Sequence, residues 1–188
     1  PLDEWAEASV VTRVAMVLCG SDWFDAVFQR LDEHITVAWH FEDGQYLPAN
    51  TTLCELEGPA HSLLTGERSA LNLLQTLSGT ASLARQYAEA VQGTGCTVLD
   101  TRKTLPGLRA AQKYAVRCGG GENHRLGLWD EILVKDNHWA ALRYWNRRGG
   151  VAPPLRRLAR TAKRRRIPIE IEVRNLKELA HLLEGTFV

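Results

Sequence analysis

The sequence has no long hydrophobic run and almost no excess of charge of either sign. No uninterrupted apolar stretch approaches the ~18 residues of a membrane-spanning helix, so we expect no membrane span. The 23 basic and 22 acidic side chains give a net charge of +1. That balance argues against a general nucleic-acid binder, which normally has a strongly basic surface. The first residues also lack the charged-then-apolar layout of a secretory signal.

Cysteine is scarce, with four residues in 188 and no CxxC pair. Their scatter argues against a disulfide framework and against a zinc site, which needs clustered ligands. We therefore expect each cysteine to be a small buried apolar residue in a reducing compartment, which predicts a cytoplasmic protein. Hydrophobic residues make up 45% of the chain, enough for one large domain or two modest ones with a real core.

The N-terminal half has the pattern of a small α+β unit. Residues 10–20 are rich in β-branched and apolar side chains and predict an extended segment. Ser21 is the expected N-cap of a helix over residues 21–32. Strands are expected at residues 35–41 and 51–57. The four-residue apolar spacing over residues 66–92 then predicts linking helices, interrupted at Ser78 and Gly79.

The C-terminal half alternates strand and helix signals. Strands are expected at residues 96–100, 132–135 and 167–173, and helices at residues 106–117, 138–147, 154–165 and 175–183. This rhythm predicts an α/β fold with a parallel sheet or barrel. A closed barrel takes roughly 200 residues or more, so this chain should contain only part of one. We predict an N-terminal domain over residues 1–92 and a partial barrel over residues 93–188.

Positively charged side chains are concentrated in residues 100–138 around a triple glycine. Arginine supplies a planar fork for carboxylate or phosphate, and lysine supplies a point charge. This segment therefore predicts a pocket for a small polyanion. The cations are Arg102, Lys103, Arg109, Lys113, Arg117, His124, Arg125 and Lys135.

Several of these charged residues follow predicted strands, at the end where parallel α/β proteins bind ligands. Arg102 and Lys103 come after residues 96–100, and Lys135 comes after residues 132–134. Glu170 and Glu172 alternate with apolar residues and should share one face of their strand. Taken singly, these features also fit a charged surface loop and a half-solvated sheet.

The glycines at 119–121 precede Asn123, His124 and Arg125. Glycine lets the backbone approach a ligand closely, which would bring His124 and Arg125 into a binding site. A flexible surface loop is the alternative interpretation.

Three segments resemble the quinolinate phosphoribosyltransferases, also called carboxylating nicotinate-nucleotide diphosphorylases. They are ERSALNLLQTLSG at residues 67–79, DTRKTLPG through VKDNH at residues 100–138, and IEIEV at residues 169–173. The resemblance covers nearly the whole chain. It implies an N-terminal open-faced α/β sandwich, a C-terminal α/β barrel, and a homodimer or larger assembly with active sites at the subunit interface.

The resemblance also implies an activity and its site residues. Quinolinate and phosphoribosyl diphosphate, with Mg²⁺, would give nicotinate mononucleotide, carbon dioxide and diphosphate. Arg68 would act on the neighbouring subunit's site, and Glu172 would lie near the ribose hydroxyls and the metal. Lys103, Lys135 and Glu172 would be catalytic. The implied substrate-binding set is Arg68, Thr101, Arg102, Lys103, His124, Arg125, Lys135 and Glu172.

Two other functions remain open at this point. One is a phosphoribosyltransferase for nicotinate or another anionic heterocycle. The other is an inactive anion- or RNA-binding remnant, for which the basic run at residues 163–166 is the motivating feature. Such a run more often lies on a solvated helix end.

Overall fold

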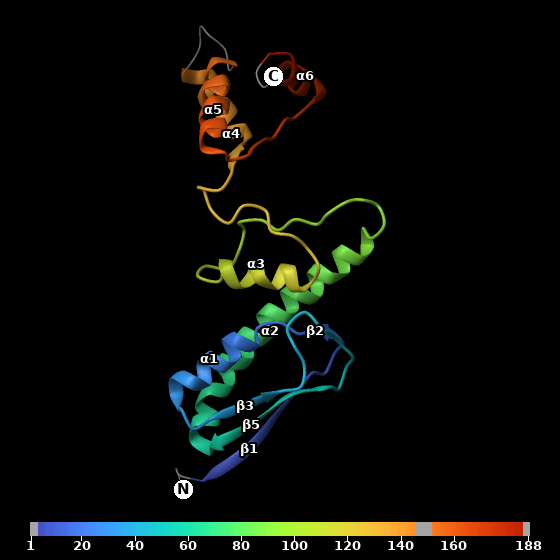
Figure 1. Ribbon diagram of the computed structural model, residues 1–188, viewed down its shortest axis with the longest axis vertical. Coiled ribbons are helices and arrows are strands. Elements are labelled where there is room, and N and C mark those ends of the chain that lie inside the picture. Colours follow the sequence, from blue (N-terminus) through green and yellow to red (C-terminus); the bar gives the residue numbers. More distant parts are fainter. Residues whose placement is uncertain (1–3, 146–151, 186–188) are drawn as a thin grey trace. The chain divides into compact units, whose positions relative to one another are not determined.

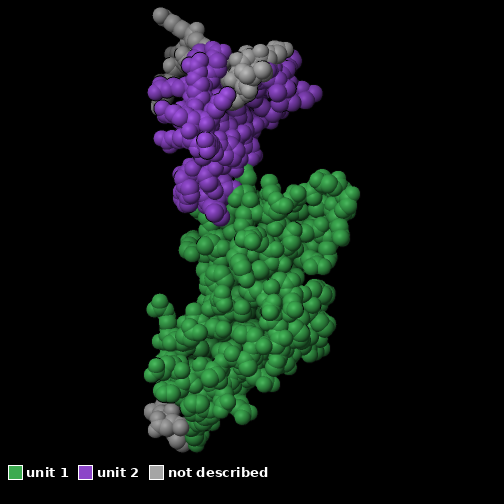
Figure 2. Space-filling view, in the orientation of Figure 1, with its two compact units in different colours: residues 1–124 green, residues 125–188 purple. Residues whose placement is uncertain are grey.

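A computed structural model describes residues 4–145 and 152–185 of the chain. The chain divides into two compact units, Pro1–His124 (unit 1) and Arg125–Val188 (unit 2), coloured separately in Figure 2. Both units combine helices and strands, which confirms the predicted α/β class. The proposed domain boundary between residues 92 and 93 stays a prediction.

Unit 1 is built on an antiparallel sheet in the order β1-β5-β3. Its strands are β1 (Trp5–Val11), β5 (Thr52–Pro59) and β3 (Thr36–Trp39), and a separate pair joins β2 (Met16–Val17) to β4 (Tyr46–Leu47). In β5 the side chains of Cys54 and Leu56 are buried, whereas those of Glu55 and Glu57 are exposed. One face of this strand therefore contributes to a core and the other faces solvent.

Two helices cover the apolar face of this sheet, as Figure 1 shows. They are α1 (Ser21–Leu31) and α2 (Ala60–Ala90). Phe24 and Phe28 of α1 pack in one core cluster with Leu63 and Leu74 of α2. Burial of these side chains against β5 gives unit 1 its main hydrophobic core.

Helix α2 is continuous over 31 residues, so the predicted interruption at Ser78 and Gly79 is wrong. The Ser78 hydroxyl lies on the inner face, where it hydrogen-bonds the backbone N–H and carbonyl of Cys19. Gly79 lies on an open face, where no other part of the described chain comes within 4 Å of the position that a Cβ would take. Tertiary contacts on one side of the helix thus outweigh the weak helix propensity of these two residues.

Two expectations about the start of the chain need correction. The extended segment at residues 10–20 is two strands, β1 and β2, separated by a turn at Thr12, whose hydroxyl donates to the carbonyl of Val14. Ser21 is the first residue of α1 rather than its cap, and Gly20 precedes it with φ of 109°. The carboxylate of Asp43, distant in sequence, accepts the backbone N–H groups of Gly20 at 2.8 Å and Ser21 at 3.3 Å.

The segment after α2 contains helix α3 (Arg109–Cys118). The strand predicted at residues 96–100 is wrong, because Leu99 forms only an isolated parallel bridge to Glu122. The predicted helix start at Pro106 is also wrong, since α3 begins at Arg109.

Unit 2 contains a parallel pair of strands, β6 (Ile132–Val134) and β7 (Ile169–Ile171). Helices α4 (Asp136–Trp145) and α5 (Ala152–Arg165) come between them, and α6 (Leu176–Gly185) follows. The predicted alternation of strand and helix is confirmed here. Residues 146 and 147 of the helix expected over residues 138–147 lie outside the described residues.

The core of unit 2 includes Val134, Trp139, Leu155 and Leu182, with Ile169 and Ile171 of β7 packed against it. Glu170 and Glu172 are exposed, so the predicted sidedness of this strand is confirmed. Within residues 4–145 and 152–185, no helix has the length and apolar character needed to cross a membrane.

Candidate functional site

A buried ion pair organises the cation-rich segment of unit 1. The ammonium of Lys113, on α3, contacts the carboxylate of Asp100, and the two side chains are 2% and 6% exposed. The same ammonium lies 3.4 Å from the backbone carbonyl of His124. A buried charge is tolerated when it is paired and hydrogen-bonded, and both conditions hold here.

Asp100 also holds the segment that follows the triple glycine. Its carboxylate accepts Nδ2 of Asn123 at 2.6 Å and the backbone N–H of His124 at 3.0 Å. Asn123 Nδ2 additionally lies 2.8 Å from the carbonyl of Lys113. The two loops that precede and follow α3 are therefore fastened to each other through one carboxylate.

The Thr101–Lys103 stretch begins directly after this anchor. The backbone carbonyl of Arg102 accepts Nη2 of Arg109 at 3.3 Å, and the backbone N–H of Lys103 donates to Oγ1 of Thr101 at 3.1 Å. Thr101 and Lys103 are exposed, and Arg102 is half-buried. The Nε of Arg102 is buried and, among the described residues, has no hydrogen-bond partner. Such a nitrogen is suited to an acceptor that the protein itself does not supply.

Unit 2 brings a second pair of predicted site residues together. Nζ of Lys135, just after β6, lies 3.1 Å from Oε1 of Glu172, just after β7. The parallel register places both residues at the same end of the strand pair, and the Glu172 N–H donates to the carbonyl of Val134 at 2.9 Å. The indole of Trp139 fixes this turn by donating to the Glu172 carbonyl at 3.1 Å. The pair is about half exposed and so is open to ligands.

Arg68 lies on α2 in unit 1. Its side chain is 76% exposed, and among the ion pairs of the described residues its guanidinium approaches only the neighbouring Glu67, at 3.9 Å. An exposed arginine of this kind can act on a neighbouring molecule, as the resemblance implies. The convergence of Arg102, Arg125 and Lys135 joins residues of both units and stays a prediction.

Two residues have roles that the sequence pattern did not predict. Lys113 is not a pocket cation, because it is buried against Asp100, and Asp100 is an anchor rather than a strand end. A signal was present, since Asp100 is the one acidic residue between positions 97 and 121. Its carboxylate is the natural partner for a cation from that stretch.

Together the fold and the site define an α/β protein with charged residues at the carboxyl end of a parallel strand pair, where proteins of this class bind their ligands. Two protein-family models match this chain and identify its family. The N-terminal domain model of quinolinate phosphoribosyl transferase matches residues 1–78, and the C-terminal domain model matches residues 80–186. The chain belongs to the quinolinate phosphoribosyl transferase family, which confirms the resemblance.

Individual relatives agree with this assignment. A probable carboxylating nicotinate-nucleotide pyrophosphorylase of Bacillus subtilis is 39% identical over 94% of this chain and 59% of its own length. The corresponding protein of Mycobacterium leprae is 46% identical over 78% of this chain and 49% of its own length. The solved nicotinate-nucleotide pyrophosphorylase from Francisella tularensis superposes with a TM-score of 0.86 at 42% identity, covering 95% of this chain and 61% of that one. The chain thus spans about half to three fifths of these relatives.

Proposed function

We propose that this protein transfers the phosphoribosyl group of phosphoribosyl diphosphate to quinolinate. Loss of one carboxyl group then gives nicotinate mononucleotide, carbon dioxide and diphosphate. The relatives named as carboxylating nicotinate-nucleotide pyrophosphorylases support this reaction. The observation that carries it in this chain is the buried Nε of Arg102, which has no hydrogen-bond partner among the described residues and follows Asp100, the residue that holds His124.

The cationic side chains of the predicted site suit a dicarboxylate such as quinolinate. Arg102 and Arg125 offer planar forks to its carboxylates, and His124 offers a ring nitrogen. A charge-assisted hydrogen bond contributes about 1.5–3 kcal/mol, so these contacts would both hold and orient the pyridine ring. Nicotinate has one carboxylate fewer and would leave part of this set unpaired.

Lys103 and Lys135 are suited to the phosphates of the sugar donor. As diphosphate leaves C1 of the ribose, positive charge grows on the sugar, and the carboxylate of Glu172 can stabilise it. Once the pyridine nitrogen is bonded to C1, the ring draws electrons from the adjacent carboxylate and carbon dioxide can depart. No covalent nucleophile is required.

Glu172 is also the residue that we propose for Mg²⁺. Its carboxylate is 48% exposed at a strand end, which fits a cation that binds one or two protein oxygens and keeps water and phosphate ligands. Bound Mg²⁺ would supply charge neutralisation for the departing diphosphate. Lys135, at 3.1 Å, would then be released from Glu172 to the phosphates.

We further propose a homodimer or larger assembly, with Arg68 contributed to the neighbouring subunit's site. Its high exposure on α2 supports a role outside its own unit. A cytoplasmic location is also proposed, because all four cysteines are free thiols, as is usual in a reducing compartment.

Quinolinate binding by calorimetry tests the substrate assignment. Arg102→Ala should weaken binding about 10- to 150-fold, the range that one charge-assisted hydrogen bond contributes. Arg30→Ala, an exposed arginine on α1, is the matched control and should bind as the unaltered protein does. Equal affinity of both variants, or a preference for nicotinate in product analysis, would contradict the assignment.

Mixed assemblies test the role of Arg68. Arg68→Ala subunits combined with Lys135→Ala subunits should regain one complete site if Arg68 acts across the interface. Failure to regain any quinolinate turnover would indicate that each site is built from one subunit. Retention of RNA at physiological salt, without turnover, would favour the remnant hypothesis instead.

A further inference from the structure

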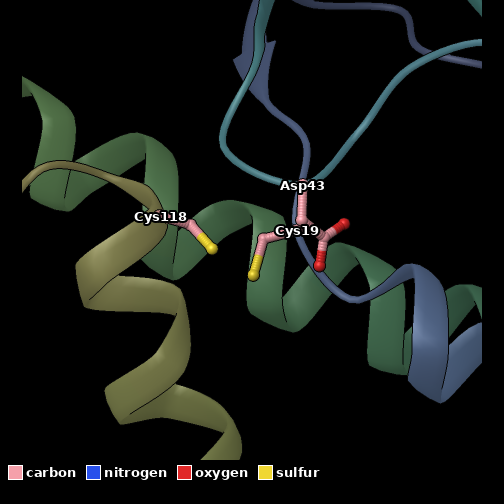
Figure 3. A group of neighbouring side chains, drawn as sticks. All are labelled: Cys19, Asp43 and Cys118. Atoms are coloured by element: carbon pink, nitrogen blue, oxygen red, sulfur yellow. The ribbon is translucent and has the colours of Figure 1, made fainter.

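Two cysteines that are far apart in the sequence meet in unit 1. Cys19 lies in the turn before α1 and is fully buried, and Cys118 is the last residue of α3 and is half-buried. Their sulfur atoms and a carboxylate oxygen of Asp43 all lie within 4.8 Å of one another. Figure 3 shows the two sulfurs facing each other from separate elements. The expectation of a small buried residue is confirmed for Cys19 and Cys54, but it is wrong for Cys96, which is exposed, and Cys118 is only half-buried.

The backbones of both cysteines are held against the same helix. The Ser78 hydroxyl of α2 accepts the N–H of Cys19 and donates to its carbonyl, both at 3.0 Å. On the other side, a Cβ at Gly119 would lie 2.2 Å from the carbonyl oxygen of Ala81, so the end of α3 rests directly on α2. Contacts with α2 therefore position both backbones, and the two sulfurs approach each other from them.

The surroundings lower the pKa of one cysteine of the pair and raise the pKa of the other. The pKa of Cys118 is lowered to about 7, first by a hydrogen bond from the Cys19 thiol and further by Tyr114 and Arg117, against burial and the charge of Asp43. Hydrogen bonding to Cys118, followed by burial, raises the pKa of Cys19. An accessible thiolate beside a protonated resolving thiol is the arrangement found in redox-sensing cysteines.

Asp43 does not turn this pair into a metal site. Its carboxylate already accepts two backbone N–H groups, those of Gly20 and Ser21, where α1 begins. With the two sulfurs it offers three ligand atoms in the described part of the chain, one fewer than a structural tetrahedral zinc site requires. A disulfide needs no further ligand and leaves no net charge among the apolar neighbours of Cys19.

We propose that Cys118 and Cys19 are a redox-active pair that hydrogen peroxide converts to a disulfide. The Cys118 thiolate attacks a peroxide oxygen, which gives a sulfenic acid and releases hydroxide. The Cys19 sulfur then attacks that sulfenic sulfur and forms the S–S bond. The Cys19 proton and the departing hydroxyl leave as water, so two thiols and one peroxide give one disulfide and two waters overall.

The disulfide would join the turn before α1 to the end of α3. Residues 119–121 follow at once, and Asn123 and His124 are fastened to Asp100 beyond them. The oxidation site thus lies one short loop away from predicted substrate-binding residues. A thiol reductant would return the pair to its starting state.

The proposal is tested on the whole chain with a small excess of hydrogen peroxide under native conditions. Peptide mapping by mass spectrometry should find Cys19 linked to Cys118 as the dominant product, with both thiols restored by dithiothreitol. The same treatment in guanidinium chloride is the matched control. There the preference should disappear, because all four cysteines then meet at random.

Variants give a second measurement. Cys96→Ser removes an exposed thiol and should leave the native cross-link unchanged, whereas Cys19→Ser should leave Cys118 as a sulfenic acid that dimedone traps. The proposal is overturned if native oxidation links other cysteines, or if Cys118 is oxidised no faster than Cys96. Tight binding of one zinc ion that blocks both thiols would overturn it in favour of a metal site.

Discussion

Breaking the buried ion pair between Lys113 and Asp100 from one side should strongly destabilise unit 1. Replacing Lys113 with Met removes the ammonium and leaves a 6%-exposed carboxylate without its charge partner. Breaking a buried pair from one side costs about 3–5 kcal/mol. Asp100 keeps its hydrogen bonds from Asn123 and His124, so we expect the lower end, about 3 kcal/mol.

That loss should be measurable in two ways. For a chain of 188 residues 1 kcal/mol corresponds to roughly 2–4 °C, so the melting temperature should fall by about 6–12 °C. Hydrogen exchange should also reveal faster exchange at the His124 amide, whose N–H donates to Asp100 at 3.0 Å. Lys103→Met is the matched control, because Lys103 is exposed on the same loop and should cost no more than about 0.5 kcal/mol.

A double-mutant cycle separates pairing from simple loss of packing. In Asp100→Asn combined with Lys113→Met no buried charge is left behind, so the combined cost should be smaller than the sum by at least about 1 kcal/mol. Additive costs would refute the reasoning. So would a Lys113→Met variant that is as stable as Lys103→Met.

Three further predictions concern other features of unit 1. Asp43→Ala should lower the free energy of unfolding by about 0.5–2 kcal/mol in urea titrations, because two amide groups at the start of α1 lose their acceptor. Asp22→Ala, which removes an exposed side chain from the first turn of α1, is the control and should lower it less. Gly119→Ala should prevent correct packing of α3, because the new methyl group would lie 2.2 Å from the backbone oxygen of Ala81. Gly79→Ala, on the open face of α2, should instead raise the free energy of unfolding by about 0.5–1 kcal/mol. Calorimetric melting compares the two variants, and equal effects would contradict the packing described. The rate of peroxide oxidation at Cys118 should rise as the pH increases through about 7 and then level off, because the thiolate is the reactive form; a rise centred near 9 in stopped-flow measurements would show an ordinary thiol.

The spacing of apolar residues predicted those helices and strands whose pattern lies entirely within the element itself. Helix α1, helices α3 to α6 and both strands of unit 2 appear within a few residues of the expected positions. The sidedness of β7 followed from simple alternation, which is why Glu170 and Glu172 could be placed on one exposed face. The cation-rich motif was specific enough to reveal the family from the sequence alone.

Features that depend on distant residues could not be read in this way. Asp43 caps a helix that starts more than 20 residues earlier, and nothing near Ser21 signals that contact. The meeting of Cys19 with Cys118 depends on how α3 packs on α2. The strand expected at residues 96–100 failed because its apolar pattern lacks a long partner, since pairing is confined to Glu122.

Because α2 is continuous, its length fixes the distance between the two hydrophobic clusters that it contributes to in unit 1. Its first half packs under the sheet through Leu63 and Leu74, while Ala81 in its second half lies against α3. One added residue between these contact regions would rotate everything beyond it by about 100° and shift it by about 1.5 Å. The surface of α2 on which α3 packs would then face away from the loop that contains Cys19. Natural variation in this helix should therefore take the form of exchanged side chains, with insertions and deletions confined to the loops at its ends.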